Sequence, residues 1–235
     1  MNALISKPAT RLIAFQKAVW VQVLAFLNIL LTKGFLIEIG VGQKFASFTT
    51  DILFLLITTL YIVFIYYLFS FFTSNRLLLN LIITCFTIAF IVASISENPF
   101  FDLELSGKKY YILAVHICYS TGTTIIIYFA TLEIFREGMS VIERLWGSAC
   151  IYFMIAWAFG GIYDIICIFN PTAMGFHHQL NLSSYMESIA YSVSVLGNFN
   201  PLYENTSILI NRIAVIEAVW AHLFVVLVVG RLLAK

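Results

Sequence analysis

Long apolar stretches dominate the chain, and short groups of charged or turn-forming residues separate them. A membrane-spanning helix needs about 20 consecutive, mostly apolar residues, because a helix rises only about 1.5 Å per residue. Six windows meet this requirement: Leu12–Ile39, Ile52–Thr73, Leu77–Ser96, Tyr110–Phe135, Leu145–Phe169 and Ile208–Leu233. The pattern therefore predicts an all-α membrane protein with six transmembrane helices.

The connection between the fifth and sixth windows, residues 170–207, is far longer than an ordinary loop between helices. It contains the apolar stretch Ser183–Leu196, which is too short to cross a membrane. Ser184 and Glu187 form a capping-box pattern that predicts a helix start, and Gly197 is the expected helix end. We expect a re-entrant pore loop whose residues 196–201 meet water. A surface amphipathic helix lying on the membrane is the alternative.

Composition supports the membrane class and removes several others. The chain is 61% hydrophobic and 11% charged, whereas soluble domains are roughly 45–50% apolar and about 25% charged. The net charge of +1 gives no reason to expect a nucleic-acid partner. The four cysteines lie inside apolar runs without metal-binding spacing, and no catalytic motif is present. We therefore expect no enzyme activity, no cofactor and no metal.

Basic residues suggest the orientation of the chain in the membrane. The N-terminus carries Lys7, Arg11 and Lys17 and precedes an apolar run longer than the core of a signal peptide, so we expect an uncleaved first helix. With the N-terminus inside, the inner side holds eight basic residues and the outer side five. This bias predicts that both termini are cytoplasmic.

The last segment, NRIAVIEAVWAHLFVVLVVGRLL, resembles the inner helix of the small bacterial potassium-channel pores. Residues at matching spacing are Arg212, Ala214, Val215, Glu217, Ala218, Arg231 and Leu232. The stretch YMESIAYSVSVLGNFNP resembles the pore helix and filter of that family, with Tyr191-Ser192, Gly197 and Pro201 at corresponding positions. The resemblance implies a pore domain over 141–235, which follows a four-helix N-terminal domain over 1–140. It also implies a homotetramer in the lipid of a bacterial inner membrane.

The loop after Gly197 departs from a potassium filter. Asn198-Phe199-Asn200 stand where the family has Tyr-Gly-Asp, and a phenylalanine does not cheaply adopt the positive φ that glycine supplies. The predicted lining is Ser194, Val195, Leu196, Gly197, Asn198, Phe199 and Asn200. We expect a channel that passes inorganic cations with weak selectivity. An anion-permeable channel and a non-conducting assembly or signalling component are the alternatives.

Four acidic residues are candidates for the surroundings of this loop. Asp164 and Glu217 lie inside predicted spans, where ionisable groups are costly, and with Glu187 they are expected to support the filter. A hydrogen-bonded structural carboxylate is the alternative for Asp164 and Glu217. Glu204 is expected to form an acidic outer vestibule, or else to be a solvated loop residue.

The remaining polar and small residues lead to three more expectations. Tyr110–Phe135 carries no arginine ladder, so the first four helices are expected to be a scaffold and not a voltage sensor. His177-His178 are expected to be solvated, with a pH-sensing or metal site shared between subunits as the alternative. Gly160-Gly161 indicates close helix packing. A single interrupted segment without a repeat argues against a secondary transporter.

Overall fold

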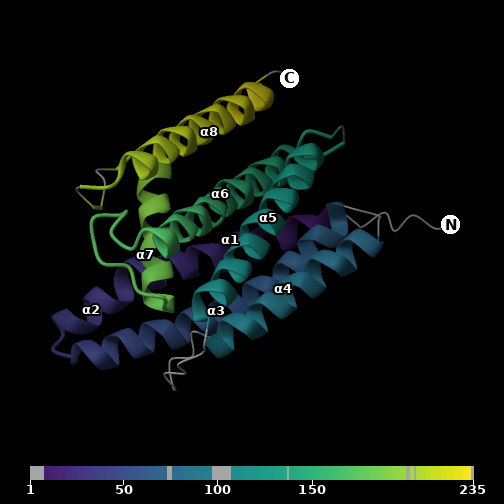
Figure 1. The fold of residues 1–235 in the computed structure, drawn as a ribbon. Helices are drawn as coiled ribbons and strands as arrows, with labels where there is room; N and C mark the ends of the chain where they lie inside the picture. The colour runs from purple at the N-terminus through teal and green to yellow at the C-terminus, as the bar shows by residue number, and fades with distance from the viewer. Residues whose placement is uncertain are drawn as a thin grey trace.

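The computed structural model describes residues 8–72, 76–96, 107–136, 138–199, 202–203 and 205–233, and every regular element in this part of the chain is a helix. Figure 1 shows their arrangement. The helices are α1 (Pro8–Leu27), a π-helical turn (Asn28–Thr32), α2 (Lys33–Glu38), α3 (Gln43–Phe72), α4 (Arg76–Ser96), α5 (Lys108–Ile134), α6 (Val141–Phe169), α7 (Leu182–Leu196) and α8 (Ile208–Leu233).

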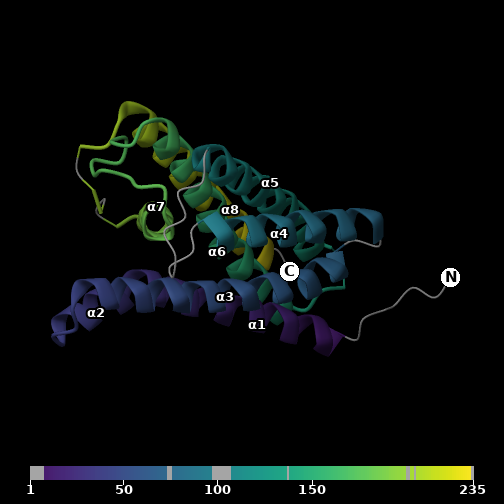
Figure 2. The same cartoon turned by 60° about the horizontal axis from the view of Figure 1, so that its bottom comes forward.

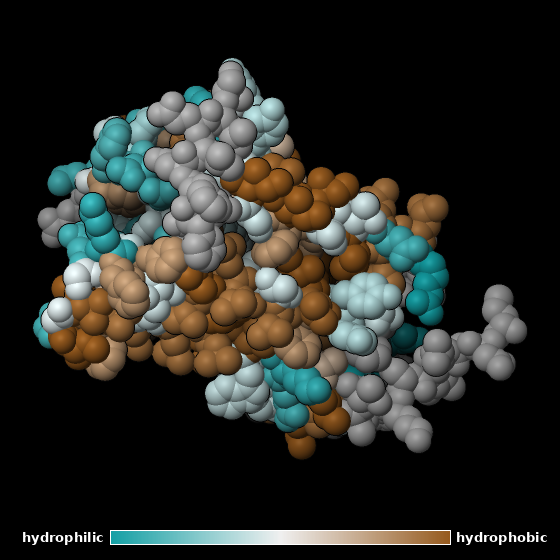
Figure 3. All heavy atoms as spheres, turned by 90° about the horizontal axis from the view of Figure 1, so that it is seen from below, coloured by the Kyte–Doolittle hydropathy of each residue, from teal (hydrophilic) through white to brown (hydrophobic). Residues whose placement is uncertain are grey.

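Six segments in the described residues are long and apolar enough to cross a membrane. The first runs from Arg11 to Glu38 through the π-helical turn, and the others belong to α3, α4, α5, α6 and α8. Many large apolar side chains on these helices are exposed, and apolar colour covers much of the face in Figure 3. Such a surface is stable in lipid and not in water, which confirms the predicted all-α membrane protein.

α3 and α6 are two of the helices that begin earlier than the hydropathy windows predicted. α3 begins at Gln43 and not at Ile52, because the Gly40 turn (φ +88°) precedes it and nothing between 43 and 51 stops a helix. α6 begins at Val141 and not at Leu145, because Ser140 and Glu143 form a capping box. The hydropathy windows mark the apolar part of a helix, and its polar first turns fall outside them.

α6 lies at the centre of the bundle and packs against α1, α5, α7 and α8. Near its N-terminal end, Arg11 of α1 contacts Glu143 (Nε–Oε1, 3.0 Å) and Glu133 of α5 (Nη1–Oε1, 3.2 Å). Farther along, Gln22 Nε2 of α1 donates to the Cys150 carbonyl at 3.3 Å. The first helices of the chain thus pack directly on α6. The predicted division at residue 140 stays a prediction.

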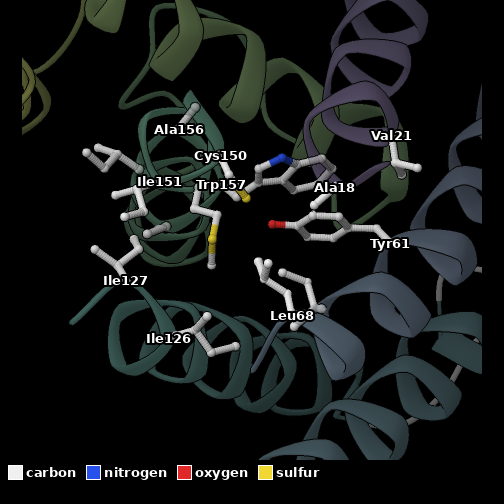
Figure 4. Close-up of a cluster of buried hydrophobic side chains, with 14 of the residues drawn as sticks. Ala18, Val21, Tyr61, Leu68, Ile126, Ile127, Cys150, Ile151, Ala156 and Trp157 are labelled. Atoms are coloured by element: carbon white, nitrogen blue, oxygen red, sulfur yellow. The ribbon is translucent and has the colours of Figure 1, made fainter. Parts of the chain in front are cut away.

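Aromatic side chains fill the core where α1 and α3 meet α6. The rings of Tyr61 and Trp157 stack with their centroids 5.5 Å apart, and Cys150 is buried beside them (Figure 4). Cys167 is also buried, Cys118 is half-buried and Cys85 is exposed, and all four thiols are free. Although all four cysteines lie in apolar runs of the sequence, only Cys150 and Cys167 are buried in the bundle.

α1 begins and α8 ends at the same end of the bundle (Figure 1). An even number of spans gives this arrangement. The prediction that this end is cytoplasmic stays a prediction. α7 is much shorter than the spans, crosses them steeply, and is viewed nearly along its axis in Figure 2.

Candidate functional site

The short helix α7 is packed inside the bundle. Most of its side chains are buried, and it contacts α6, α8, α3 and the π-helical turn. This burial argues against an amphipathic helix lying alone on the membrane surface, and the re-entrant loop stays a prediction. On α6, Gly160 makes the close approach of α7 possible, since a Cβ there would lie 2.8 Å from Ile189 Cγ1 and 3.0 Å from Ile189 Cα. The close packing indicated by Gly160-Gly161 is confirmed.

A methyl group at Gly160 should loosen this contact. We expect Gly160→Ala to lower the free energy of unfolding of the detergent-solubilised protein by about 1–3 kcal/mol, because a backbone atom of α7 would have to shift. The melting temperature should fall accordingly. Gly34→Ala is the matched control, since no atom lies within 4 Å of a Cβ built at that helical glycine. Equal melting temperatures for the two variants would contradict the close contact between α6 and α7.

The start of α7 differs from its prediction. The predicted capping box at Ser184 and Glu187 is wrong, because Asn181 is the N-cap and its side chain accepts from Ser184 N at 2.9 Å. Asparagine caps a helix as well as serine does, so the earlier residue takes the role. The Ser184 hydroxyl instead accepts from Gln179 N at 3.1 Å. The Glu187 carboxylate accepts a hydrogen bond from the Tyr203 hydroxyl.

The end of α7 is a tight C-terminal turn. The helix ends at Leu196 with Gly197 as its cap, as the sequence predicted. Asn198 has a left-handed φ of 53° and donates its N–H to Val195 O at 3.1 Å, while Phe199 N donates to Ser194 O at 3.0 Å. This pair of bonds is the Schellman arrangement. The carbonyls of Ser194 and Val195 are therefore hydrogen-bonded within the turn.

Two more features fix this turn. The Tyr152 hydroxyl of α6 donates to the carbonyl of Leu196 at 2.6 Å. Gly197 has an ordinary φ of −74°, so its lack of a side chain serves packing: a Cβ there would lie 2.3 Å from the Phe199 ring. Sequence reasoning missed Tyr152, because its partner is a backbone carbonyl that only the folded chain brings near.

The predicted lining residues have different exposures. Ser194 and Leu196 are buried, and Val195 is half-buried. Gly197, Asn198 and Phe199 are exposed, and Phe199 is 71% exposed. Asn200, Pro201 and Glu204 lie outside the described residues. The part of the described segment that reaches the surface is thus 197–199.

Asp164 of α6 joins three parts of the chain. Its Oδ2 lies 2.9 Å from His116 Nε2 of α5, and its Oδ1 lies 2.7 Å from His178 Nε2 of the α6–α7 connection. The Ser188 hydroxyl of α7 donates to Oδ1 at 3.3 Å. All four residues are buried. A carboxylate in an apolar interior needs such partners, because an unpaired charge there is very costly.

The predicted solvation of the histidine pair is half wrong. His177 is exposed, but His178 is buried against Asp164. Neighbouring residues of an irregular connection point in different directions, and the sequence does not say which one turns inward. The contact between His116 and Asp164 could have been predicted from the sequence, because a histidine and an aspartate inside separate spans are candidates to pair.

Glu217 of α8 is a second buried carboxylate that contacts α7. Its Oε2 accepts from the Tyr163 hydroxyl of α6 at 2.6 Å, and its Oε1 accepts from the Ser192 hydroxyl of α7. Ser188 and Ser192 lie one turn apart on α7, and Ser188 contacts Asp164 of α6 while Ser192 contacts Glu217 of α8. Asp164 and Glu217 thus hold α7 from both flanking helices.

The segment after α7 returns to the end of α6 where the connection began. Ser207 N donates to the Ala173 carbonyl at 2.7 Å. Tyr203 stacks on the Tyr191 ring with centroids 6.3 Å apart. Burial, followed by the hydrogen bond to Glu187, raises the pKa of Tyr203 well above its usual value. Tyr203 is therefore a neutral hydrogen-bond donor that ties the returning segment to α7.

Neither a metal site nor a known relative accounts for this arrangement. Within the described ranges, no group of three or more histidine, cysteine, aspartate and glutamate side chains is placed to hold a metal ion. Comparison with protein-family models, curated proteins and solved structures found no match to the chain.

Proposed function

We propose that this chain is the subunit of a tetrameric membrane channel. Four α7 helices would surround a central axis, and ions would pass the turn 197–199. The observation that carries this proposal is α7 itself, a short helix held between α6 and α8 by the buried carboxylates Asp164 and Glu217. Such anchors fix the position of a helix end, which an ion pathway requires. The resemblance of the last two helices to potassium-channel pores supports the same assignment.

Weak cation selectivity follows from the chemistry of the turn. The C-terminal end of a helix carries partial negative charge, which favours cations. A potassium filter needs a stack of carbonyls that replace the water around the ion. The carbonyls of Ser194, Val195 and Leu196 already accept hydrogen bonds within the subunit, so they are poor candidates for such a stack. Exposed Asn198 would instead present its carboxamide to a partly hydrated ion.

A non-conducting assembly component is the second candidate. The end of α7 is closed by its own Schellman turn and by Tyr152, without help from another subunit. This closure favours a pore-like fold that serves assembly or signalling. Conduction separates the two candidates directly.

The test combines mass with ion permeation. We expect detergent-solubilised protein to have four times the 26.6 kDa subunit mass. In planar bilayers, reversal potentials in asymmetric potassium, sodium and chloride should show similar permeability to the two cations and little to chloride. Asn198→Gly removes the carboxamide, and glycine still tolerates the left-handed φ of this position. This variant should change the relative permeabilities to potassium, sodium and chloride. Asn211→Ala, an exposed carboxamide at the start of α8, is the control.

The possible results have distinct meanings. A stable monomer or dimer would overturn the pore. A tetramer without conductance would favour the assembly role. A strong potassium preference would mean that a carbonyl stack forms despite the bonds described above. A chloride-selective current would replace the cation pathway by an anion pathway.

A further inference from the structure

A groove in the lipid-facing side of the bundle lies between α3 and the α4–α5 pair. Its volume is about 760 Å³, open space at the mouth included. Phe54 and Ile62 of α3 form one wall, Phe86 and Phe90 of α4 form the other, and Trp157 of α6 lies at the floor. The floor aromatics are the stacked pair of Trp157 and Tyr61 seen in Figure 4.

The position of the groove determines which molecules can reach it. Its α3 residues lie in the middle turns of the candidate span Gln43–Ser70, and its α4 residues run from the middle of Arg76–Ser96 to its last turn. Neighbouring side chains on the same turns, such as Leu60 and Ile88, are exposed to the outside of the bundle. In a membrane, this depth is hydrocarbon, so the groove opens into lipid chains and not into water.

The chemistry of the lining points to the same occupant. Of the described residues that line the groove, none is a lysine, arginine, aspartate or glutamate. A phosphate or other charged headgroup would find no partner there, whereas an alkyl chain would contact aromatic rings on three sides. Small side chains, among them Thr58 and Ala93, leave the space that the larger ones do not fill.

The groove also reaches the candidate pore helix. Leu182 and Tyr185, in the first turns of α7, complete its lining together with His116. The His116 and Tyr185 rings lie with centroids 4.5 Å apart, and His116 contacts Asp164. We propose that this groove binds one acyl chain of a membrane lipid, which packs against the first turns of α7 beside the Asp164 cluster.

Quenching of Trp157 fluorescence by brominated lipid tests this proposal without any measurement of conduction. The other three tryptophans are replaced in the variant Trp20→Phe/Trp146→Phe/Trp220→Phe, so that emission comes from Trp157 alone. The protein is placed in phosphatidylcholine vesicles whose acyl chains carry bromine near their ends, and in matched unbrominated vesicles. We expect strong quenching, although Trp157 is only 8% exposed, because the chain in the groove brings bromine to the indole.

Filling the groove supplies the control. Ala93→Phe should reduce the quenched fraction by about twofold or more, because the added ring occupies the space of the chain. Ile95→Phe, on the lipid-exposed side of the same helix, should leave quenching unchanged. Two results would overturn the proposal: no quenching of Trp157 in the single-tryptophan protein, or equal quenching in the Ala93→Phe and Ile95→Phe variants. A folded, quenched protein that does not conduct would refute the channel and leave the lipid site intact.

Discussion

Asp164→Ala is expected to destabilise the protein by about 3 kcal/mol, roughly the loss expected when one member of a buried charged cluster is removed. The substitution removes the shared partner of His116, His178 and Ser188, which belong to three different parts of the chain. The measurement is the unfolding midpoint in detergent, together with the yield of folded protein.

Two further variants give this result its meaning. Asp164→Asn keeps the shape of the side chain but not its charge, so a loss between wild type and Asp164→Ala is expected. Asp51→Ala is the matched control, because Asp51 also lies in a candidate span but its buried Oδ1 has no hydrogen-bond partner among the described residues. An Asp164→Ala protein as stable as the Asp51→Ala protein would show that the cluster does not hold the helices together.

The spans were predictable because lipid imposes one simple rule on them. A segment that crosses hydrocarbon must be apolar, helical and long, and these properties are local in the sequence. The window Ile208–Leu233 coincides with α8 for this reason. The start of α3 was missed because Gln43 to Asp51 is polar enough to leave the window, yet helical.

The site was predictable only in part. Asp164 and Glu217 stood out because ionisable residues inside spans are rare, but their partners were not visible. His178 reaches Asp164 because of the path of the α6–α7 connection, and Tyr152 reaches the Leu196 carbonyl because of the tilt of α7. Neither the path nor the tilt produces a periodic pattern in the sequence. Likewise, Asn181 and Ser184 both suit an N-cap, and tertiary packing decides between them.

Glu217→Ala is expected to have the second large effect, on the attachment of α7 to α8. The carboxylate is fully buried and accepts hydrogen bonds from Tyr163 and Ser192, so its loss leaves two buried hydroxyl donors unsatisfied. Each unsatisfied donor costs about 1–3 kcal/mol, whereas hydrogen bonds inside membrane proteins average about 0.6 kcal/mol. A net loss of about 2 kcal/mol is therefore expected.

Amide hydrogen exchange measures this loss where it should occur. A loss of about 2 kcal/mol corresponds to roughly 30-fold faster exchange in α7 if its amides exchange by local opening, since about 1.4 kcal/mol is one factor of ten. Ser192→Ala keeps the Glu217 bond to Tyr163 and should accelerate exchange less. Glu38→Ala, at an exposed glutamate of α2, is the control and should leave α7 unchanged. If α7 exchanged at the wild-type rate in Glu217→Ala, Glu217 would not be an anchor of this helix. The proposed pore would then depend on Asp164 alone to hold α7, and its conductance should survive the substitution.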